Sequence, residues 1–149
     1  MSDFALAFKN TTEKHSDKLS DYVGLTIIKL HEKVDSRSPV GDPTKWDSPP
    51  PPGYVGGRFR ANWQLGVGSA PEGEVAGIDD DGSKTRDTVT ASLPGDGKNA
   101  GPVYYLVNNL PYAQRLEDGH STQAPLGMVG LAVAEFPQLA STAKSESGL

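Results

Sequence analysis

The chain has 149 residues with a formal net charge of −5, and it contains 17 glycines, 12 prolines and no cysteine. The length predicts one domain that can bury a sufficient core without covalent cross-links. The missing cysteines exclude disulfides and thiolate metal sites and fit a reducing cytoplasm, and no apolar run approaches the ~20 residues of a membrane helix.

The first predicted element is a long helix that ends at Ser38-Pro39, because a residue before proline avoids the helical region. Its apolar residues recur at intervals of three or four and form one buried face: Leu19, Val23, Ile27, Leu30 and Val34. A separate short helix, residues 4–8, is predicted before it, capped by Asp3. We interpret the apolar face as core rather than as a partner-binding surface.

Residues 37–57 form a proline-rich loop that includes four consecutive prolines at 49–52, a run typical of extended polyproline II. Trp46 and Tyr54 are predicted anchors of this loop, because aromatic side chains gain free energy when they are covered. We expect the loop to order against a neighbouring molecule. The alternative is an adaptor protein that offers this loop as a polyproline ligand to a foreign domain.

The next segment, residues 57–67, alternates apolar and polar side chains and predicts a strand with one buried face. The acidic run at 79–82 does not meet the calcium-loop pattern, which requires glycine sixth and glutamate twelfth, and it is interpreted as a solvated turn. Residues 83–93 fit either a strand or one helical face.

The last third of the chain predicts a strand at 103–107, which is rich in β-branched and aromatic residues. A short helix should follow, with Pro111 near its first position and its end between Glu117 and Gly119. A polar loop then leads to a final helix that starts near Val129 and is kinked or ended by Pro137. Residues 1–140 are thus one domain, and 141–149 are predicted to be a flexible tail.

Five short motifs occur in a fixed order: SPV (38–40), GRFRANW (57–63), NNLPYA (108–113), LEDGHS (116–121) and QAPLGMV (123–129). Together they resemble the small neck or tail-completion (tail-component) proteins of long-tailed bacteriophages. The resemblance covers the chain from about Ser38 to Phe136. Many relatives join the first two motifs with a short turn, whereas this chain inserts the proline-rich loop, so no role for the loop is implied.

The resemblance implies an α+β domain, in which a long N-terminal helix packs on a small, mainly antiparallel sheet with flanking helices. It also favours the helix over the strand for residues 83–93. It also implies a structural virion protein, a ring-forming subunit at the head–tail junction that helps to join the tail to the head. The implied partners are further copies of the chain, with six as the expected ring, and other neck, connector and tail-terminator proteins. Genome DNA would pass nearby without specific binding, since the chain is acidic and its basic residues are scattered. The implied location is the neck or tail of the virion, assembled in the cytoplasm of the bacterial host.

The candidate site residues follow from the same motifs, either as subunit contacts or as locally satisfied residues of the fold. One group would shape or line a subunit contact: Tyr112, Glu117, His120, Ser121, Gln123 and Pro125. A second group would anchor the sheet or face a neighbour: Arg58, Arg60 and Trp63.

The sequence contains no recognisable catalytic set, and we expect neither an enzyme nor a bound cofactor or metal. The alternative is a small metal-dependent hydrolase in which Glu117, Asp118 and His120 gather at one helix end and hold a divalent ion, since carboxylates and imidazole are suitable ligands. Clusters of this kind at helix ends are more often hydrogen-bonded turns.

Overall fold

The computed structural model describes residues 2–149. In chain order the elements are α1 (Asp3–Arg37), the 3-10 turn η1 (Pro43–Lys45), α2 (Arg58–Ala61), β1 (Trp63–Val67), α3 (Ser83–Ala91), β2 (Tyr104–Asn108), α4 (Ala113–Glu117), α5 (Val129–Ala134) and α6 (Phe136–Ser147). The predicted α+β class is confirmed. No helix among the described residues is long and apolar enough to cross a membrane.

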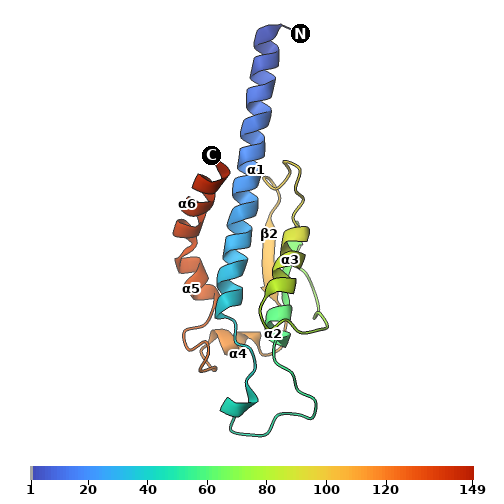
Figure 1. Cartoon of the computed structure of the whole chain (residues 1–149), viewed down its shortest axis with the longest axis vertical. Helices are drawn as coiled ribbons and strands as arrows, with labels where there is room; N and C mark the ends of the chain where they lie inside the picture. Colours follow the sequence, from blue (N-terminus) through green and yellow to red (C-terminus); the bar gives the residue numbers. More distant parts are fainter. Residues whose placement is uncertain (1) are drawn as a thin grey trace.

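Helix α1 is the axis of the molecule (Figure 1). Its 35 residues correspond to a length of about 52 Å. The prediction of a separate helix at residues 4–8 was wrong, because no proline or glycine interrupts the chain before Gly24 and the helix continues unbroken. Ser2, rather than Asp3, provides the cap, and its hydroxyl accepts a hydrogen bond from the Ala5 N–H. The predicted end at Ser38 is confirmed, since Ser38 is extended (φ −71°, ψ 130°).

Only the second half of α1 is packed. Residues 6–19 are all exposed, and this part of the helix extends beyond the rest of the protein (Figure 1). Along the predicted apolar face, Val34 is buried and Leu19 is exposed, with partial burial between them. The packed half of α1 lies between α5 and α6 on one side and α3 on the other (Figure 1).

Helices α5 and α6 meet at Glu135, and Pro137 occupies the first turn of α6, so the predicted break at this proline is confirmed. The prediction of a frayed tail from Ser141 was wrong about secondary structure, because α6 runs to Ser147. Ala143 is fully buried, and Lys29 of α1 forms an ion pair of 2.9 Å with Glu146. Tertiary packing on α1 therefore orders a serine-rich segment that has little helical preference of its own.

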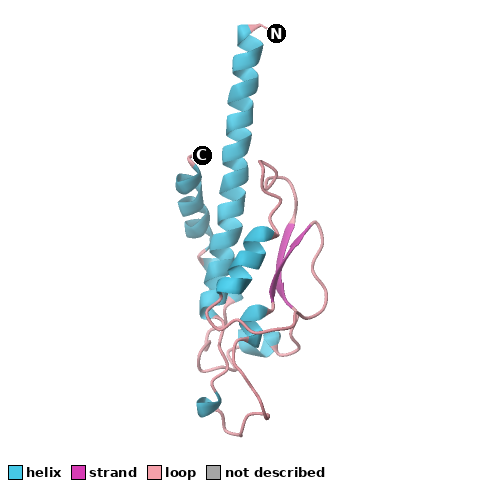
Figure 2. Cartoon of the chain, turned by 45° about the vertical axis from the view of Figure 1, so that its right-hand side comes forward, coloured by secondary structure: helices cyan, strands magenta, loops and turns pink. Residues whose placement is uncertain are grey.

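The sheet consists of β1 and β2, which pair antiparallel from Trp63 opposite Asn108 to Val67 opposite Tyr104 (Figure 2). The predicted strand at 57–67 is only half correct, because its first part forms the helical turn α2. Gly57 enters this turn with φ +101°, and Phe59 and Trp63, four residues apart, are both buried. Asn62 is buried as well, whereas Ala61 is only half-buried, so burial here does not follow the alternation of a strand. The favoured helix at 83–93 is confirmed as α3.

The core lies where the end of α1 meets α2, β1 and the segment from Leu110 to α5. Its buried members are Val34, Phe59, Trp63, Leu110, Ala124, Met128 and Ala132, with Leu30, Leu106, Ala113 and Leu116 packed around them. Phe59 and Trp63 meet edge to face, with ring centroids 5.9 Å apart. The motif segments therefore supply most of the core.

The loop between Ala124 and α5 offers a matched test of this core. Met128 is 1% exposed and Leu126 is 74% exposed, so the two side chains differ mainly in burial. Met128→Ala should lower the free energy of unfolding by about 2–5 kcal/mol, because it removes buried methylenes and leaves a cavity. Leu126→Ala should change it by less than about 0.5 kcal/mol. Urea unfolding of both variants measures the difference, and equal losses would mean that Met128 is not a core residue.

Candidate functional site

Ser38 joins three of the motif elements at the end of α1. Its buried hydroxyl donates to the Val34 carbonyl at 2.7 Å and accepts the Trp63 indole N–H at 2.9 Å. The Ser38 carbonyl accepts Nε of Arg60 at 3.1 Å, and another nitrogen of this guanidinium donates to the Asp80 carbonyl. Arg60 and Trp63 are thus occupied within the chain, where they tie α1 to α2, β1 and the loop before α3.

Glu117, at the end of α4, connects the LEDGHS motif to the QAPLGMV motif through hydrogen bonds. Its carboxylate accepts the backbone N–H groups of Met128, Val129 and Gly130, each at 2.9 Å, and so caps the first turn of α5. Partial burial favours the neutral acid, but these three N–H groups outweigh it and hold the pKa of Glu117 below its usual value of 4.5. A side chain at Gly127 would collide with this carboxylate, and Gly127 also has φ +76°.

The polar loop after α4 contacts both the segment after α1 and helix α4. Gln123 accepts the Val40 N–H through Oε1 at 3.0 Å, while Nδ1 of His120 lies 3.0 Å from the Arg115 carbonyl. Ser121 turns the chain through bonds within the loop. Pro125 is exposed, and its carbonyl lies so close to Gly119 (φ +86°) that no side chain fits there.

These segments wall a cleft of about 910 Å³ between the end of α1, the proline-rich loop and α4. The predicted site residues that line it are Trp46, Tyr54, Arg58, Tyr112, His120, Ser121 and Gln123, whereas Arg60, Trp63, Glu117 and Pro125 do not. The structure therefore brings seven of the eleven candidates to one concave surface.

Aromatic side chains dominate this cleft. Trp46 packs against Tyr54 with ring centroids 4.7 Å apart, and Tyr54 covers Gly41 so closely that no side chain fits at that glycine. Across the cleft Tyr112 packs on Phe59 at 6.2 Å. Partial burial raises the pKa of Tyr112 above its usual value, although Arg58 opposes the shift. The two aromatic anchors of the proline-rich loop thus pack on each other and on Gly41 within the loop itself.

The charges around the cleft are mostly paired within the chain. Arg58 forms an ion pair with Glu74, and Lys45 lies 3.5 Å from Asp42. Asp47 also lines the cleft, and it forms no ion pair with any residue of the described chain. The cleft is therefore suited to an apolar or aromatic group rather than to a strongly charged one.

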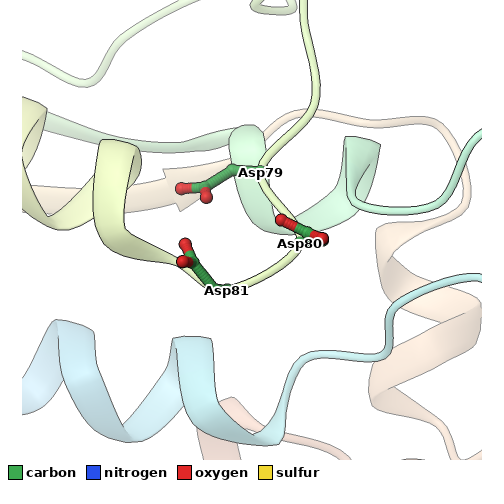
Figure 3. A group of neighbouring side chains, drawn as sticks. All are labelled: Asp79, Asp80 and Asp81. Carbon is green, nitrogen blue, oxygen red and sulfur yellow. The ribbon is translucent and has the colours of Figure 1, made fainter.

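The residues of the alternative metal site, Glu117, Asp118 and His120, do not form a group within the described chain that could hold one metal ion. The Glu117 carboxylate accepts backbone N–H groups at the start of α5, and Asp118 accepts a hydrogen bond from Gln114. Among residues 2–149, the group of potential ligands that gathers within 4.8 Å is instead Asp79, Asp80 and Asp81 (Figure 3).

The acidic turn at 79–81 was predicted to be solvated, and for Asp79 this was wrong. Asp79 is 2% exposed. Its carboxylate accepts the N–H groups of Gly82 and Thr85 and the Thr85 hydroxyl, at 2.7–3.0 Å. It therefore caps the start of α3, and this cap explains why the three carboxylates converge.

A buried polar pair on α1 was not identified from the sequence. His31 is 1% exposed and neither ring nitrogen has a hydrogen-bond partner within the described chain, nor does Oδ1 of Asp35 one turn later. Both residues line a small cavity of about 230 Å³ against the start of α3. The signal available was their spacing of four residues on the helix face that also carries Ser20 and Gly24.

Burial controls the protonation of this pair. Burial lowers the pKa of His31 to about 4; Asp79 opposes the shift and Arg86 adds to it. Burial also raises the pKa of Asp35, with Asp79 and Asp81 acting in the same direction and Arg60 against it. Both groups therefore favour their uncharged forms.

Comparison with protein-family models, curated proteins and solved structures finds no significant match for this chain.

The Glu117 cap predicts a specific loss of stability. Glu117→Gln should lower the free energy of unfolding by about 1–3 kcal/mol at pH 7, because the amide has one acceptor oxygen for three N–H groups and no charge. Since the folded-state pKa is lowered, the contribution is complete above pH 4.5 and is lost as the pH falls through the folded-state value. Asp118→Asn, at an exposed neighbouring carboxylate, is the control. A difference from the wild-type protein that persists at the lowest pH would contradict the electrostatic part of this account.

His31 predicts a second pH dependence. The unfolded chain takes up a proton near pH 6.5, but folded His31 does so only near pH 4. The stability linked to His31 is therefore present above pH 6.5 and lost as the pH falls to 4. Wild-type protein should lose on the order of 2 kcal/mol more than His31→Gln over this range. Unfolding at a series of pH values measures this, with His15→Gln, at an exposed position, as control. Parallel curves for wild type and His31→Gln would refute the assignment.

Proposed function

We propose that this chain is a structural virion protein of a tailed bacteriophage, a ring-forming neck or tail-completion subunit that helps to join the tail to the head. The proposal takes its class from the five motifs and their order. The observation that carries it is that two distant motif groups, residues 38–63 and 108–129, meet in one core and wall one cleft.

The chemistry of these residues supports an assembly role over catalysis. Glu117 and Asp79 serve as caps of α5 and α3, and His120 contacts a backbone carbonyl. The hydrolase alternative would need Glu117, Asp118 and His120 on one ion, whereas each of them contacts a different group. The cleft remains accessible to a neighbouring molecule and carries exposed aromatic side chains. Such side chains are enriched at protein interfaces.

In this role the partners are further copies of the chain, six in the ring we favour, together with neck, connector and tail-terminator proteins. The site of action is the virion neck. The genome would pass the ring without tight binding, because the net charge of −5 provides no cluster of cations to displace counterions from phosphate.

The test is to locate the chain in virions of the phage that encodes it. Labelled or tagged protein should lie at the head–tail junction in several copies that form a closed ring, and we expect about six, to match the symmetry of the tail. Particles made without the chain should yield filled heads and separate tails. Imaging of whole particles with quantitative mass spectrometry measures both. Label along the tail or on the capsid, or a single copy per particle, would overturn the proposal.

A further inference from the structure

The free end of α1 carries a cluster of apolar side chains with no support from the body of the protein. Phe4, Leu6 and Phe8 are 79%, 50% and 66% exposed, and the two phenyl rings stack with centroids 6.4 Å apart. Phe4 and Phe8, four residues apart, share one face of the helix, whereas Leu6 lies on the opposite face. Single exposed apolar residues are normal on a protein surface, but a stacked aromatic pair indicates a contact surface. We call these three residues the helix tip.

The cleft lies at the opposite end of the molecule, beside the proline-rich loop at the bottom of Figures 1 and 2. Its wall also leaves apolar side chains exposed: Trp46, Val55, Ile78 and Tyr112. A volume of about 910 Å³ is enough to receive large apolar groups. The chain thus has an apolar projection at one end and an apolar recess at the other.

The helix tip cannot enter the cleft of its own chain. Helix α1 is continuous from Asp3 to Arg37, and the cleft begins beyond its C-terminal end, at Pro39 and Val40. The helix holds the two surfaces apart by roughly its own length, about 50 Å. Any contact between them must therefore join different molecules.

We propose that the helix tip of one copy docks into the cleft of a second copy, with Phe4 and Phe8 against its aromatic wall. The exposed half of α1 has no net charge that would repel it from the cleft of a second copy. Residues 3–18 carry three acidic side chains (Asp3, Glu13, Asp17) and three basic ones (Lys9, Lys14, Lys18), so their charges cancel. The incoming N-terminal end of α1 also carries partial positive charge. Asp47, the unpaired carboxylate of the cleft, complements it.

The size of the contact explains when it would form. Two phenyl groups bury at most about 150–250 Å² each, well below the ~800 Å² per partner of a stable interface. One such contact is weak between free subunits, and it becomes effective when the same contact repeats around an assembly. Because the two surfaces lie at opposite ends, the contact made head to tail is heterologous and generates a ring or a filament, whereas the same contact made reciprocally closes a two-fold dimer. The ring rests on the proposed function, whereas the contact itself does not.

Cross-linking tests the contact directly, because the chain has no cysteine of its own. Ala7→Cys places a thiol beside Phe8, and Val55→Cys places one at the cleft. The two variants, with tags of different size, are mixed at high concentration with a flexible bismaleimide. We expect a mixed dimer several-fold more abundant than with Val103→Cys, an exposed control position outside the cleft lining.

A second variant separates docking from chance collision. Phe4→Asp with Phe8→Asp, added to the Ala7→Cys chain, should reduce the mixed dimer to the control level. The fold should be unaffected, because both side chains are exposed on the part of α1 that extends beyond the body, and at Phe4 an acidic residue is favourable in the first helical turn. A mixed dimer no more abundant than the control, or one that survives the double substitution, would overturn the inference. A predominant product between two Ala7→Cys chains would show instead that helix tips pair with each other.

The two proposals fail separately. Cross-linking without a place at the head–tail junction would leave the contact intact and refute the neck assignment. A junction protein without this cross-link would keep its assigned function but assemble through another surface.

Discussion

The buried hydroxyl of Ser38 connects the elements that meet at the cleft end of this protein. Ser38 stands where α1 stops, and it is bonded both to the last turn of that helix and to the indole of Trp63. Its carbonyl also accepts Arg60. Without these bonds the indole N–H would be buried without a partner, at a cost of about 1–3 kcal/mol. The end of α1, the start of the sheet and the wall of the cleft therefore depend on the same residue.

Two carboxylates also hold elements of the fold in place, because each caps the start of a helix. Glu117 caps α5 from a distance of 11–13 residues along the chain, and Asp79 caps α3 within a buried turn. Each satisfies backbone N–H groups that would otherwise lack partners at a helix start. This explains how the LEDGHS motif can be structural, since its Glu117 carboxylate is used to position α5.

The two flanks of α1 differ in chemistry. Toward the core and α6 the buried residues are apolar, with Val34 in the core and Leu139 and Ala143 on α6, and ion pairs of α1 with Glu135 and Glu146 border them. Toward α3 they are polar: His31 and Asp35 are buried, and burial lowers the pKa of His31 and raises the pKa of Asp35. Beyond the body the helix continues without support, which is costly for an isolated segment and suggests that its free end gains a partner in the assembled state. Cleft and helix tip are then two parts of one contact surface.

The sequence by itself determined the features that depend on neighbouring residues. Pro39 ends α1, Pro137 separates α5 from α6, and the β-rich run pairs as β2, because each effect acts within a few residues. The apolar spacing of 83–93 fits a strand as well as a helix and did not decide between them. The tertiary structure alone decided the rest. Residues 58–61 form a helical turn and α6 extends through a serine-rich segment because burial against distant residues outweighs local preference. The partners of Glu117, Asp79 and Ser38, and the convergence of the candidate residues on one cleft, depend on contacts that no local pattern specifies.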